Sequence, residues 1–320
     1  MRILTADIGG TNSRFGLVEF DGKVGSRSLR LVSSIWLPTS ESPDFTGLLQ
    51  RMGQEAPHIA ADLDAAAFAL AGPIENGVFC RPPNIGWSVH LDDIRSLLPT
   101  SNFFLLNDFV AQAFACNAPE LVDARVLYSG TPICHTPVAI IGAGTGLGKC
   151  LLLPGLPPTP LPSEGGHAVF PFVGREEFEF ADFVGRHTQR RIIGDVVLSG
   201  MGLRLLHAFH TGQWLEPAAI ASVLTPDHPS ERWFARFYGR ACQGFVLDTL
   251  AQGGLFIAGG IAAKNPNFVV HPEFLEEFRN ADAHRKLLEQ VPVYLVHGPD
   301  AALYGAALYA LGRLGLFGPE

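Results

Sequence analysis

Two glycine-rich turns, each set between two short apolar runs, constrain the fold of this chain more than any other feature. The first is Asp7-Ile8-Gly9-Gly10-Thr11-Asn12, between apolar residues 2–8 and 13–20. The second is the run from Gly142 to Gly148, between residues 138–141 and 149–153. Strand-like runs separated by turn formers predict β-hairpins. Because one hairpin opens each half of the chain, the sequence predicts two similarly built domains that face one another across a cleft.

Strand-like and helical segments alternate through the rest of the 320-residue chain. Short apolar runs predict further buried strands at 29–36, 65–71, 103–106, 255–258 and 293–296. The spacing of apolar residues predicts helices at about 44–56, 107–116, 175–190, 201–210, 231–252 and 300–316. The proline-rich segment 154–162 is predicted to be a loop, because proline is rigid and lacks a backbone donor. The alternation indicates an α/β protein with mixed sheets, and its length suits two domains that divide near residues 108–112.

Composition argues against several classes of protein. Hydrophobic residues make up 47% of the chain and the mean hydropathy is +0.20, so the sequence can form sizeable cores and is not disordered. With 23 Lys and Arg against 31 Asp and Glu, the formal net charge is −8, which argues against nucleic-acid binding. No apolar run approaches the roughly 18–20 residues of a membrane span. Five dispersed cysteines without a C-x-x-C pair predict a reduced, cytoplasmic protein with no zinc site.

The first glycine-rich turn has the residues of a phosphate site. Gly9 and Gly10 allow the backbone to turn tightly and to approach a ligand, because neither has a Cβ atom. Successive backbone N–H groups in such a turn can bind an anion, and Thr11 adds a hydroxyl group. Asp7, at the end of the preceding strand, is placed to hold a magnesium ion beside the phosphates. Taken alone, the segment also fits an ordinary hairpin turn.

The second turn and a later pair of glycines are further candidates for nucleotide binding. The spacing of the second turn differs from that of a dinucleotide fingerprint, and no Gly-Lys-Ser/Thr follows it as in a P-loop. Gly259 and Gly260 follow a buried strand, where they would let adenine and ribose lie against the backbone. Each segment alone also fits tight backbone packing. Two such hairpins, one in each half, support phosphate binding more strongly than either does alone.

Polar residues at two other turns are candidates for substrate chemistry. Asp108 follows Asn107 where a buried strand meets a helix, which suits a general base but also an ordinary helix N-terminus. Glu164 and His167 follow the proline-rich segment. The two glycines between them argue against a helix, and therefore against half of a di-metal site. A loop that presents both side chains fits hydrogen bonding to sugar hydroxyls, although His167 also fits a purely structural histidine.

Together, and in this order, these segments resemble the bacterial glucokinase family of the sugar kinase/actin superfamily. The resemblance runs from Ile3 to about Leu311. Its motifs are Asp7–Asn12, Ala71-Gly-Pro-Ile followed by Asn84 and Trp87, Leu106-Asn-Asp-Phe, Gly142–Gly148, Glu164-Gly-Gly-His, Val197-Leu-Ser-Gly-Met-Gly and Phe256-Ile-Ala-Gly-Gly-Ile. The family resemblance implies an α/β, two-domain, actin/hexokinase-like (ribonuclease H-like) fold with a cleft between domains, in which the last helix returns to the first domain. We therefore expect a small domain of residues 1–110 plus 300–320 and a large domain of residues 111–299.

The resemblance also implies ATP-dependent phosphorylation of glucose at its 6-hydroxyl, with Mg²⁺ as cofactor and Asp108 as the base that takes the hydroxyl proton. Asp7 would hold the magnesium, through water. The residues implied to bind the sugar are Asn84, Asn107, Asp108, Glu164, His167 and Asp195. Those implied to bind ATP are Asp7, Gly9, Gly10, Thr11, Asn12, Gly144, Thr145, Gly146, Gly259 and Gly260. Membership of this family further implies a cytoplasmic homodimer.

One departure from the family pattern concerns the sugar. Where the family usually carries a Glu that contacts the sugar, this chain has Asp195, whose side chain is shorter by one methylene. The alternatives are therefore a kinase for another hexose, such as mannose or an N-acetylhexosamine, and a nucleotide- and sugar-binding regulator without catalysis. The joint presence of Asp7 and Asp108 argues against the regulator. The chain also lacks the Cys/His zinc motif of the related repressor/open-reading-frame/kinase family.

Overall fold

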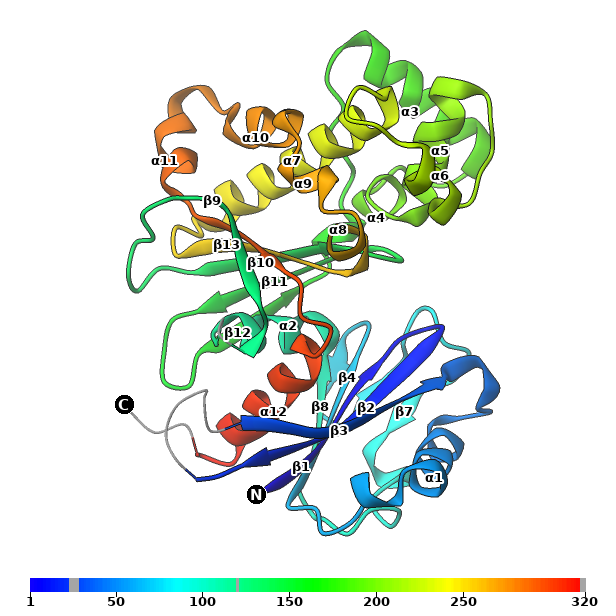
Figure 1. Cartoon of the computed structure of the whole chain (residues 1–320), viewed down its shortest axis with the longest axis vertical. Helices are drawn as coiled ribbons and strands as arrows, with labels where there is room; N and C mark the ends of the chain where they lie inside the picture. Colours follow the sequence, from blue (N-terminus) through cyan, green and yellow to red (C-terminus); the bar gives the residue numbers. More distant parts are fainter. Residues whose placement is uncertain (23–28, 119–120, 317–320) are drawn as a thin grey trace. The chain divides into compact units, whose positions relative to one another are not determined.

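The computed structural model describes residues 1–22, 29–118 and 121–316, and their contacts divide the chain into two units. The first unit comprises Met1–Ala124, Leu152–Pro162 and His297–Glu320, and the second comprises Arg125–Leu151 and Ser163–Val296. The predicted boundary at residue 110 falls inside helix α2 (Asp108–Cys116), all of which belongs to the first unit. The reason is packing, because α2 lies against α12 (Ala301–Arg313) within that unit (Figure 1).

A five-stranded mixed sheet forms the centre of the first unit, in the order β3-β2-β1-β4-β8 (Figure 1). β1 (Arg2–Ile8) and β2 (Asn12–Phe20) form the predicted hairpin, and β3 (Leu29–Pro38) pairs antiparallel with β2. β4 (Ala65–Leu70) runs parallel to β1, and β8 (Phe103–Asn107) runs parallel to β4. The carboxyl ends of β1, β4 and β8 therefore meet at one edge of the sheet. A small separate sheet contains β5 (Ile74–Glu75), β6 (Phe79–Cys80) and β7 (Val89–His90).

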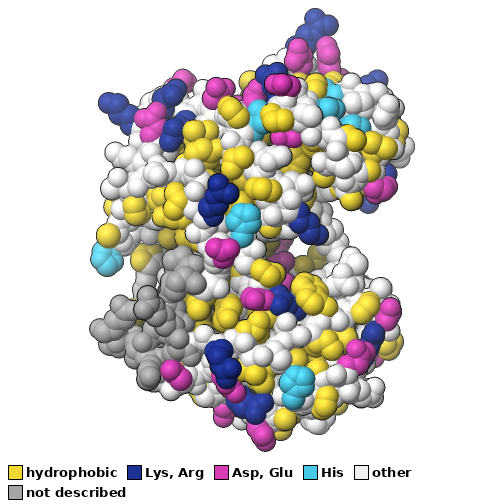
Figure 2. Space-filling view, viewed as in Figure 1, with side chains coloured by type: hydrophobic (Ala, Val, Ile, Leu, Met, Phe, Trp, Pro, Cys, Tyr) yellow, Lys and Arg dark blue, Asp and Glu magenta, His cyan; other side chains and the backbone are white. Residues whose placement is uncertain are grey.

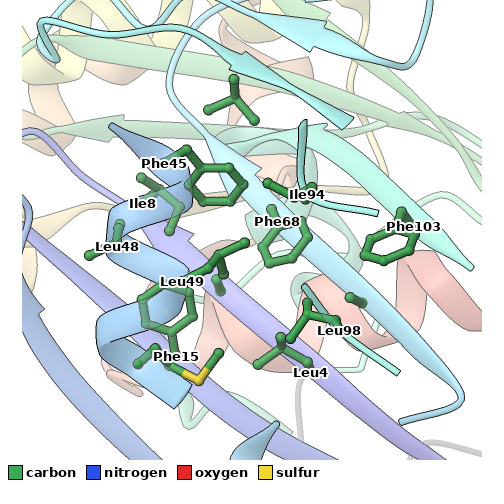
Figure 3. Packing of buried hydrophobic residues seen from close by; sticks show 14 of the residues in the cluster. Leu4, Ile8, Phe15, Phe45, Leu48, Leu49, Phe68, Ile94, Leu98 and Phe103 are labelled. Carbon is green, nitrogen blue, oxygen red and sulfur yellow. The ribbon is translucent and has the colours of Figure 1, made fainter. Parts of the chain in front are cut away.

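Helix α1 (Phe45–Glu55) packs on this sheet and forms much of the core of the first unit. Asp44 caps the helix by accepting a hydrogen bond from Gly47 N at 2.7 Å. The buried side chains of α1 have the spacing of one helical face and are Phe45, Leu48, Leu49 and Met52. Figure 3 shows Phe45 beside Phe68 of β4, and their rings meet edge-on with centroids 5.2 Å apart. Burying each such side chain contributes about 1.5–3 kcal/mol, which fixes α1 on the sheet.

Helix α12, the last of the described chain, packs on α2 and on strands β1, β2 and β4. A Cβ atom at Gly305 of α12 would overlap the carbonyl oxygen of Ala111 in α2, so the two helices approach to backbone contact. Leu303 of α12 also packs closely on Gly16 of β2, since a Cβ there would be 2.8 Å from Leu303 Cδ1. The last helix thus completes the core of the unit that begins with the first strand.

Replacing Gly305 by alanine is expected to destabilise the protein by about 1–3 kcal/mol, because the added methyl forces α12 away from α2. Alanine is otherwise the better helix former, and the matched control is Gly244→Ala in α7 (Pro229–Thr249). Nothing lies within 4 Å of a Cβ at Gly244, so that variant should be about 0.5–1 kcal/mol more stable. Urea unfolding of both variants measures the difference, and stabilisation by both would contradict the close packing of α2 and α12.

The second unit contains a six-stranded sheet in the order β12-β11-β10-β13-β14-β9. Its strands are β9 (Ala124–Tyr128), β10 (Val138–Ala143), β11 (Leu147–Leu153), β12 (Thr159–Ser163), β13 (Gly254–Ala258) and β14 (Val293–Val296). The succession β12-β11-β10-β13-β14 has the same layout as β3-β2-β1-β4-β8, which confirms the predicted likeness of the two halves. The prediction of a loop over 154–162 was wrong in part, because β12 forms there. A proline-containing strand is tolerated because β12 lies at the edge of its sheet.

Long helices of the second unit lie where the sequence predicts them, and short ones were not predicted. The long helices are α3 (Gly174–Thr188), α5 (Gly200–Thr211) and α7. The short helices are α4 (Gly194–Val197), α6 (Pro217–Val223), α8 (Gly260–Lys264), α9 (Asn267–Val270), α10 (Pro272–Arg279) and α11 (Arg285–Gln290). Single turns of 3₁₀ helix are η2 (Thr39–Glu41), η3 (Pro57–Ile59), η4 (Leu91–Asp93), η6 (Gly165–His167) and η7 (Asp282–His284).

The surface and the cysteines fit the composition. All five cysteines are free thiols, so no disulfide joins the described strands and helices. Figure 2 shows acidic and basic side chains interspersed over the visible face, with hydrophobic side chains between them. Within the described ranges, no helix is both long enough and apolar enough to cross a bilayer.

Candidate active site

The first glycine-rich turn joins β1 to β2 and is closed by a hydrogen bond from Gly9 N to Asn12 O at 3.1 Å. A Cβ at Gly9 would lie 2.8 Å from that same oxygen. A Cβ at Gly10 would lie 2.9 Å from the carbonyl oxygen of Asn84, so Asn84 packs directly against the turn. A side chain at either position would clash with a backbone carbonyl oxygen, so both positions require glycine. The predicted sugar ligand Asn84 and the predicted phosphate turn are neighbours.

Thr39, directly after β3, stabilises this turn by hydrogen bonds, a role that the sequence did not indicate. Its hydroxyl donates to Gly9 O at 2.7 Å and also lies 2.7 Å from the hydroxyl of Ser13. Its backbone N–H donates to Thr11 O at 3.0 Å. Thr39 is 1% exposed, so these bonds are shielded from water. A threonine after Pro38 carries no distinctive signal, because its partners are distant in sequence.

Replacing Thr39 by valine should destabilise the protein and weaken the ATP binding that the family resemblance implies for the first turn. The variant leaves Gly9 O and the Ser13 hydroxyl without a buried partner, which costs about 1–3 kcal/mol. We expect KM for ATP to rise several-fold and KM for the sugar to change less, as measured by steady-state kinetics. Thr39→Ser keeps the hydroxyl and is the control. A nucleotide affinity of Thr39→Val equal to that of the control would show that the turn does not depend on this bond.

Asp7 and Asp108 lie at the same edge of the first sheet. In the register of the sheet, Asp7 of β1 lies beside Ala69 of β4, and Ala69 lies beside Leu106 of β8. Asn107 is the last residue of β8, and Asp108 begins α2 directly after it. Because β1, β4 and β8 are parallel, their carboxyl ends bring the two acidic residues to one side of the sheet, with only β4 between their strands. This is the edge at which open α/β sheets bind ligands.

Asn107 is the N-cap of α2, and Asp108 is the first residue of the helix. The Oδ1 atom of Asn107 accepts hydrogen bonds from Phe109 N at 2.9 Å and Val110 N at 3.3 Å. Its Nδ2 atom donates to Gly72 O at 3.1 Å. Asp108 Oδ1 accepts from Phe109 N at 3.0 Å. Asn107 therefore supplies the cap, and the Asp108 carboxylate lies at the positive end of the helix dipole of α2.

Cys80 lies close enough to Asp108 to respond to its charge. Burial and, secondly, the negative charge of Asp108 raise the pKa of the Cys80 thiol to about 11. The sulfur donates to Ala71 O at 3.6 Å. Cys80 is therefore an uncharged thiol at neutral pH, and it adds no second negative charge to the surroundings of Asp108.

The surroundings of Asp7 disfavour the ionised form of its carboxyl group. Burial raises the pKa of its carboxyl to about 6, although the positive charge of Arg14 opposes the shift. Arg14 lies opposite Asp7 in the β1–β2 pairing, but its guanidinium is engaged by Asp300, Pro299 O and the hydroxyl of Ser34. Mg²⁺ commonly binds one or two carboxylates together with substrate phosphates and waters. A single carboxylate beside a phosphate turn fits that donor set, and a bound cation would relieve the cost of burying the Asp7 charge.

In the second unit, the second glycine-rich turn and the later glycine pair also lie together. Gly142 at the end of β10 is paired with Ala258 at the end of β13. Gly259 then turns away with φ +87°, and a Cβ there would lie 2.7 Å from Ala143 O. Ala143 N donates to the hydroxyl of buried Tyr238 at 3.1 Å. The predicted phosphate turn and adenosine segment are therefore adjacent backbone segments, and Tyr238 is a support that the sequence did not reveal.

The predicted sugar loop contains one turn of 3₁₀ helix, η6, rather than an irregular loop. His167 Nε2 lies 3.7 Å from Glu164 Oε2 and 3.7 Å from Asp195 Oδ2, so the imidazole stands between two carboxylates. Asp195 comes from α4 and accepts a hydrogen bond from Leu147 N at 2.9 Å. Lys149 of β11, which sequence reasoning missed, also borders the loop. A Cβ at Gly165 would lie 3.6 Å from its Nζ atom.

The predicted site residues thus form two sets. The first unit holds Asp7, Gly9, Gly10, Thr11, Asn12, Asn84, Asn107 and Asp108. The second holds Gly144, Thr145, Gly146, Glu164, His167, Asp195, Gly259 and Gly260. In the described part of the chain, no three His, Cys, Asp or Glu side chains converge as a ready-made metal cluster, so a metal ion here would depend on the substrate for further ligands.

Comparison with known proteins bears on the family and the fold of this chain. The family model described as Glucokinase matches residues 4–312. A glucokinase from Nostoc punctiforme is 31% identical over 96% of this chain and 98% of that protein. The solved glucokinase from an Antarctic psychrotroph has a TM-score of 0.80 and 27% identity, over 97% of this chain and 98% of that one. A glucokinase from Balamuthia mandrillaris solved with glucose has a TM-score of 0.77 at 20% identity, over 97% and 93% of the two chains.

These similarities confirm two conclusions from the motifs. The fold is the two-domain α/β fold of actin and hexokinase, which the structural likeness shows over nearly the whole chain. The match of a family model to residues 4–312, together with 31% identity to a curated member, establishes the relationship. The chain belongs to the glucokinase family of ATP-dependent sugar kinases.

Proposed function

We propose that this protein transfers the γ-phosphoryl group of ATP to the 6-hydroxyl of glucose, giving glucose 6-phosphate and ADP, with Asp108 as general base. One observation carries this proposal. The parallel strands β1, β4 and β8 bring Asp7 and Asp108 to the same sheet edge, next to the glycine-rich turn. A kinase needs a carboxylate for the hydroxyl proton and a second carboxylate near the phosphates, and a sheet edge of this kind supplies both.

In the proposed reaction, Asp108 accepts the proton of the sugar 6-hydroxyl as that oxygen forms its bond to the γ-phosphorus. The bond from the γ-phosphorus to the bridging oxygen breaks, and its electron pair leaves with ADP. Since Gly9 N closes the turn onto Asn12 O, the N–H groups of Gly10 and Thr11 are proposed to bind phosphate oxygens, and the lack of a Cβ at Gly9 and Gly10 makes room for them. Asp7 would hold a magnesium ion, through water, and that ion would neutralise part of the phosphate charge. Because phosphoryl transfer needs little covalent help, positioning and charge neutralisation supply most of the rate.

We further propose that the two units act as the two domains of the kinase. We propose sugar-binding roles for Asn84, Asn107 and Asp108 in the first unit, and for Glu164, His167 and Asp195 in the second. Asn107 has one amide hydrogen left for this purpose, because its oxygen caps α2 and its other hydrogen is directed to Gly72 O. In each unit, the glycine-rich turn is proposed to bind phosphate groups.

A kinase for another hexose is the second candidate function, and the hydrogen bond of Asp195 is the observation that favours it. This carboxylate is already engaged by Leu147 N, so it is less available to a sugar hydroxyl than a longer side chain would be. A coupled ADP-release assay with ATP, magnesium and a panel of hexoses tests both candidates. We expect rapid turnover with glucose and little with mannose or N-acetylglucosamine. Faster turnover with another hexose would replace glucose as the substrate, and no turnover with any sugar would refute the kinase proposal.

We also propose a cytoplasmic homodimer, which the family resemblance implies. Sedimentation velocity distinguishes a single 34.4 kDa chain from a pair. A purely monomeric protein at micromolar concentration would refute the dimer without affecting the proposed reaction.

A further inference from the structure

Asp195 lies between the second glycine-rich turn and the sugar loop and touches both. Its Oδ1 atom accepts a hydrogen bond from Leu147 N at 2.9 Å. A Cβ at Gly146 would lie 2.5 Å from its Oδ2 atom, and a Cβ at Gly166 would overlap Oδ1. The carboxylate therefore occupies a space bounded by one glycine from each segment. Only 28% of the side chain is exposed.

The backbone that carries Asp195 is tied to the same two segments. Gly194 N donates to Ala168 O at 3.1 Å, directly after the sugar loop. A Cβ at Gly194 would lie 2.9 Å from Gly166 O and 2.9 Å from Leu147 Cδ2. Ile193 forms a β-bridge with Val169. Asp195 thus has little freedom to turn away from its position between the two segments.

The contacts of the carboxylate are divided between the two predicted ligand sites. Leu147 and Gly146 belong to the turn that would bind ATP phosphates, whereas Gly166 and His167 belong to the loop that would bind the sugar. His167 Nε2 is 3.7 Å from Asp195 Oδ2, close enough for attraction when the imidazole is protonated. Any shift of the turn that breaks the bond to Leu147 N also changes the support of His167.

We propose that Asp195 is a positioning residue that fastens the second glycine-rich turn to the sugar loop, so that nucleotide and sugar each favour the binding of the other. The inference rests on the proposed function, since it takes the two segments as nucleotide and sugar sites. It differs from the role of a plain sugar ligand in one consequence. Asp195 supports nucleotide binding even when no sugar is present.

The first experiment measures binding without turnover. Isothermal titration calorimetry with the magnesium complex of a non-hydrolysable ATP analogue, with and without glucose, compares the wild type with Asp195→Ala and Asp195→Asn. We expect Asp195→Ala to weaken nucleotide binding without glucose by about 5–20-fold, because the turn loses a charge-assisted hydrogen bond. Asp195→Asn keeps an acceptor oxygen and should stay within about threefold of the wild type. An unchanged nucleotide Kd in Asp195→Ala, with only glucose binding weakened, would make Asp195 a sugar ligand and overturn the proposal.

A double-mutant cycle tests the contact itself. The three atoms nearest to a Cβ at Gly146 all belong to Asp195, so Gly146→Ala should weaken nucleotide binding and lower Tm only while Asp195 is present. We expect the fall in Tm caused by Gly146→Ala to be at least halved in the Asp195→Ala background. Gly166→Ala is the matched control, because a Cβ there also overlaps Leu147 O and its cost should persist in both backgrounds. An equal cost of Gly146→Ala in both backgrounds would refute the link.

These readouts separate the inference from the proposed reaction. Nucleotide affinity and Tm are measured without phosphoryl transfer, so they test the role of Asp195 even if glucose proves not to be the substrate. If Asp195→Ala fails to fold, the fall in Tm caused by Gly146→Ala is measured in the Asp195→Asn background instead. In that background the amide still fills the space beside Gly146, so the cost of Gly146→Ala should remain. Its disappearance would overturn the proposal.

Discussion

Asp108→Asn is expected to lower kcat by about 10²–10⁴-fold, the usual contribution of a general base. The amide has the size of the carboxylate and its Oδ1 can still accept the hydrogen bond from Phe109 N, so helix α2 should begin as before. The binding of the sugar should change by only several-fold, because the amide can still hydrogen-bond to a hydroxyl. The amide cannot accept the proton of the 6-hydroxyl, and the loss therefore falls on the chemical step.

Steady-state kinetics with saturating ATP, together with a direct measurement of glucose affinity, test this expectation. The matched control is Asp93→Asn, which changes an exposed carboxylate on η4 of the same unit and should leave kcat unchanged. Turnover of Asp108→Asn at the wild-type rate would remove Asp108 from the mechanism. A large loss of glucose affinity with an unchanged kcat would instead make Asp108 a sugar ligand only.

Asp7→Asn is expected to make the ligand-free protein more stable and the enzyme nearly inactive. Since the pKa of Asp7 is raised from 3.8 to about 6, the folded state holds this proton more tightly than the unfolded state does. Stability therefore falls as the pH rises from about 4 to about 6, and the loss persists above that range. Allowing for the partial exposure of Asp7, the amide should recover about 1–2 kcal/mol at pH 7–8. Arg14 keeps its partners Asp300 and Ser34 in the variant, so no charge is left unpaired.

The same substitution removes the carboxylate proposed to hold magnesium. We expect kcat/KM for ATP to fall by about 10²-fold or more, the scale on which removal of one electrostatic group slows such transfers. Urea unfolding of wild type and variant between pH 4 and 8 gives the stability difference, which should vanish near pH 4. A variant that is less stable than the wild type at pH 8 would contradict the raised pKa. Wild-type activity would contradict the magnesium role.

The features that the sequence predicted well are those with strong local signals. Asp44 followed by apolar residues at helical spacing identified α1, and Asn107-Asp108 identified the start of α2. The turns at Gly9-Gly10 and Gly142–Gly148 predicted both hairpins, because tight turns between apolar runs have few other solutions. The parallel order of β1, β4 and β8 then brought Asp7 and Asp108 to one edge. In these places local preference and tertiary packing agree.

The features that the sequence did not predict depend on distant partners. Thr39 acts on Gly9, which is thirty positions away, and no local pattern marks it. β12 forms in a proline-rich segment because an edge strand needs only one hydrogen-bonded side. Asp195 was identified from a motif as a sugar ligand, yet its bond to Leu147 N could be found only from the folded backbone. Short helices such as α4 lack the length that gives a periodic signal.

The contact between Gly305 and Ala111 also has a consequence for the order in which the first unit can be completed during synthesis. Helix α12 packs on α2 and on β1, β2 and β4, yet among the described helices it is the last to be synthesised. The strand and helix that carry Asp108 are made early and must wait for nearly two hundred further residues before this packing surface is covered. In a nascent chain that stops before residue 301, the faces of α2 and of the sheet that α12 covers are therefore exposed. Synthesis of α12 therefore ends an interval in which an apolar face of the first unit is exposed and prone to aggregation.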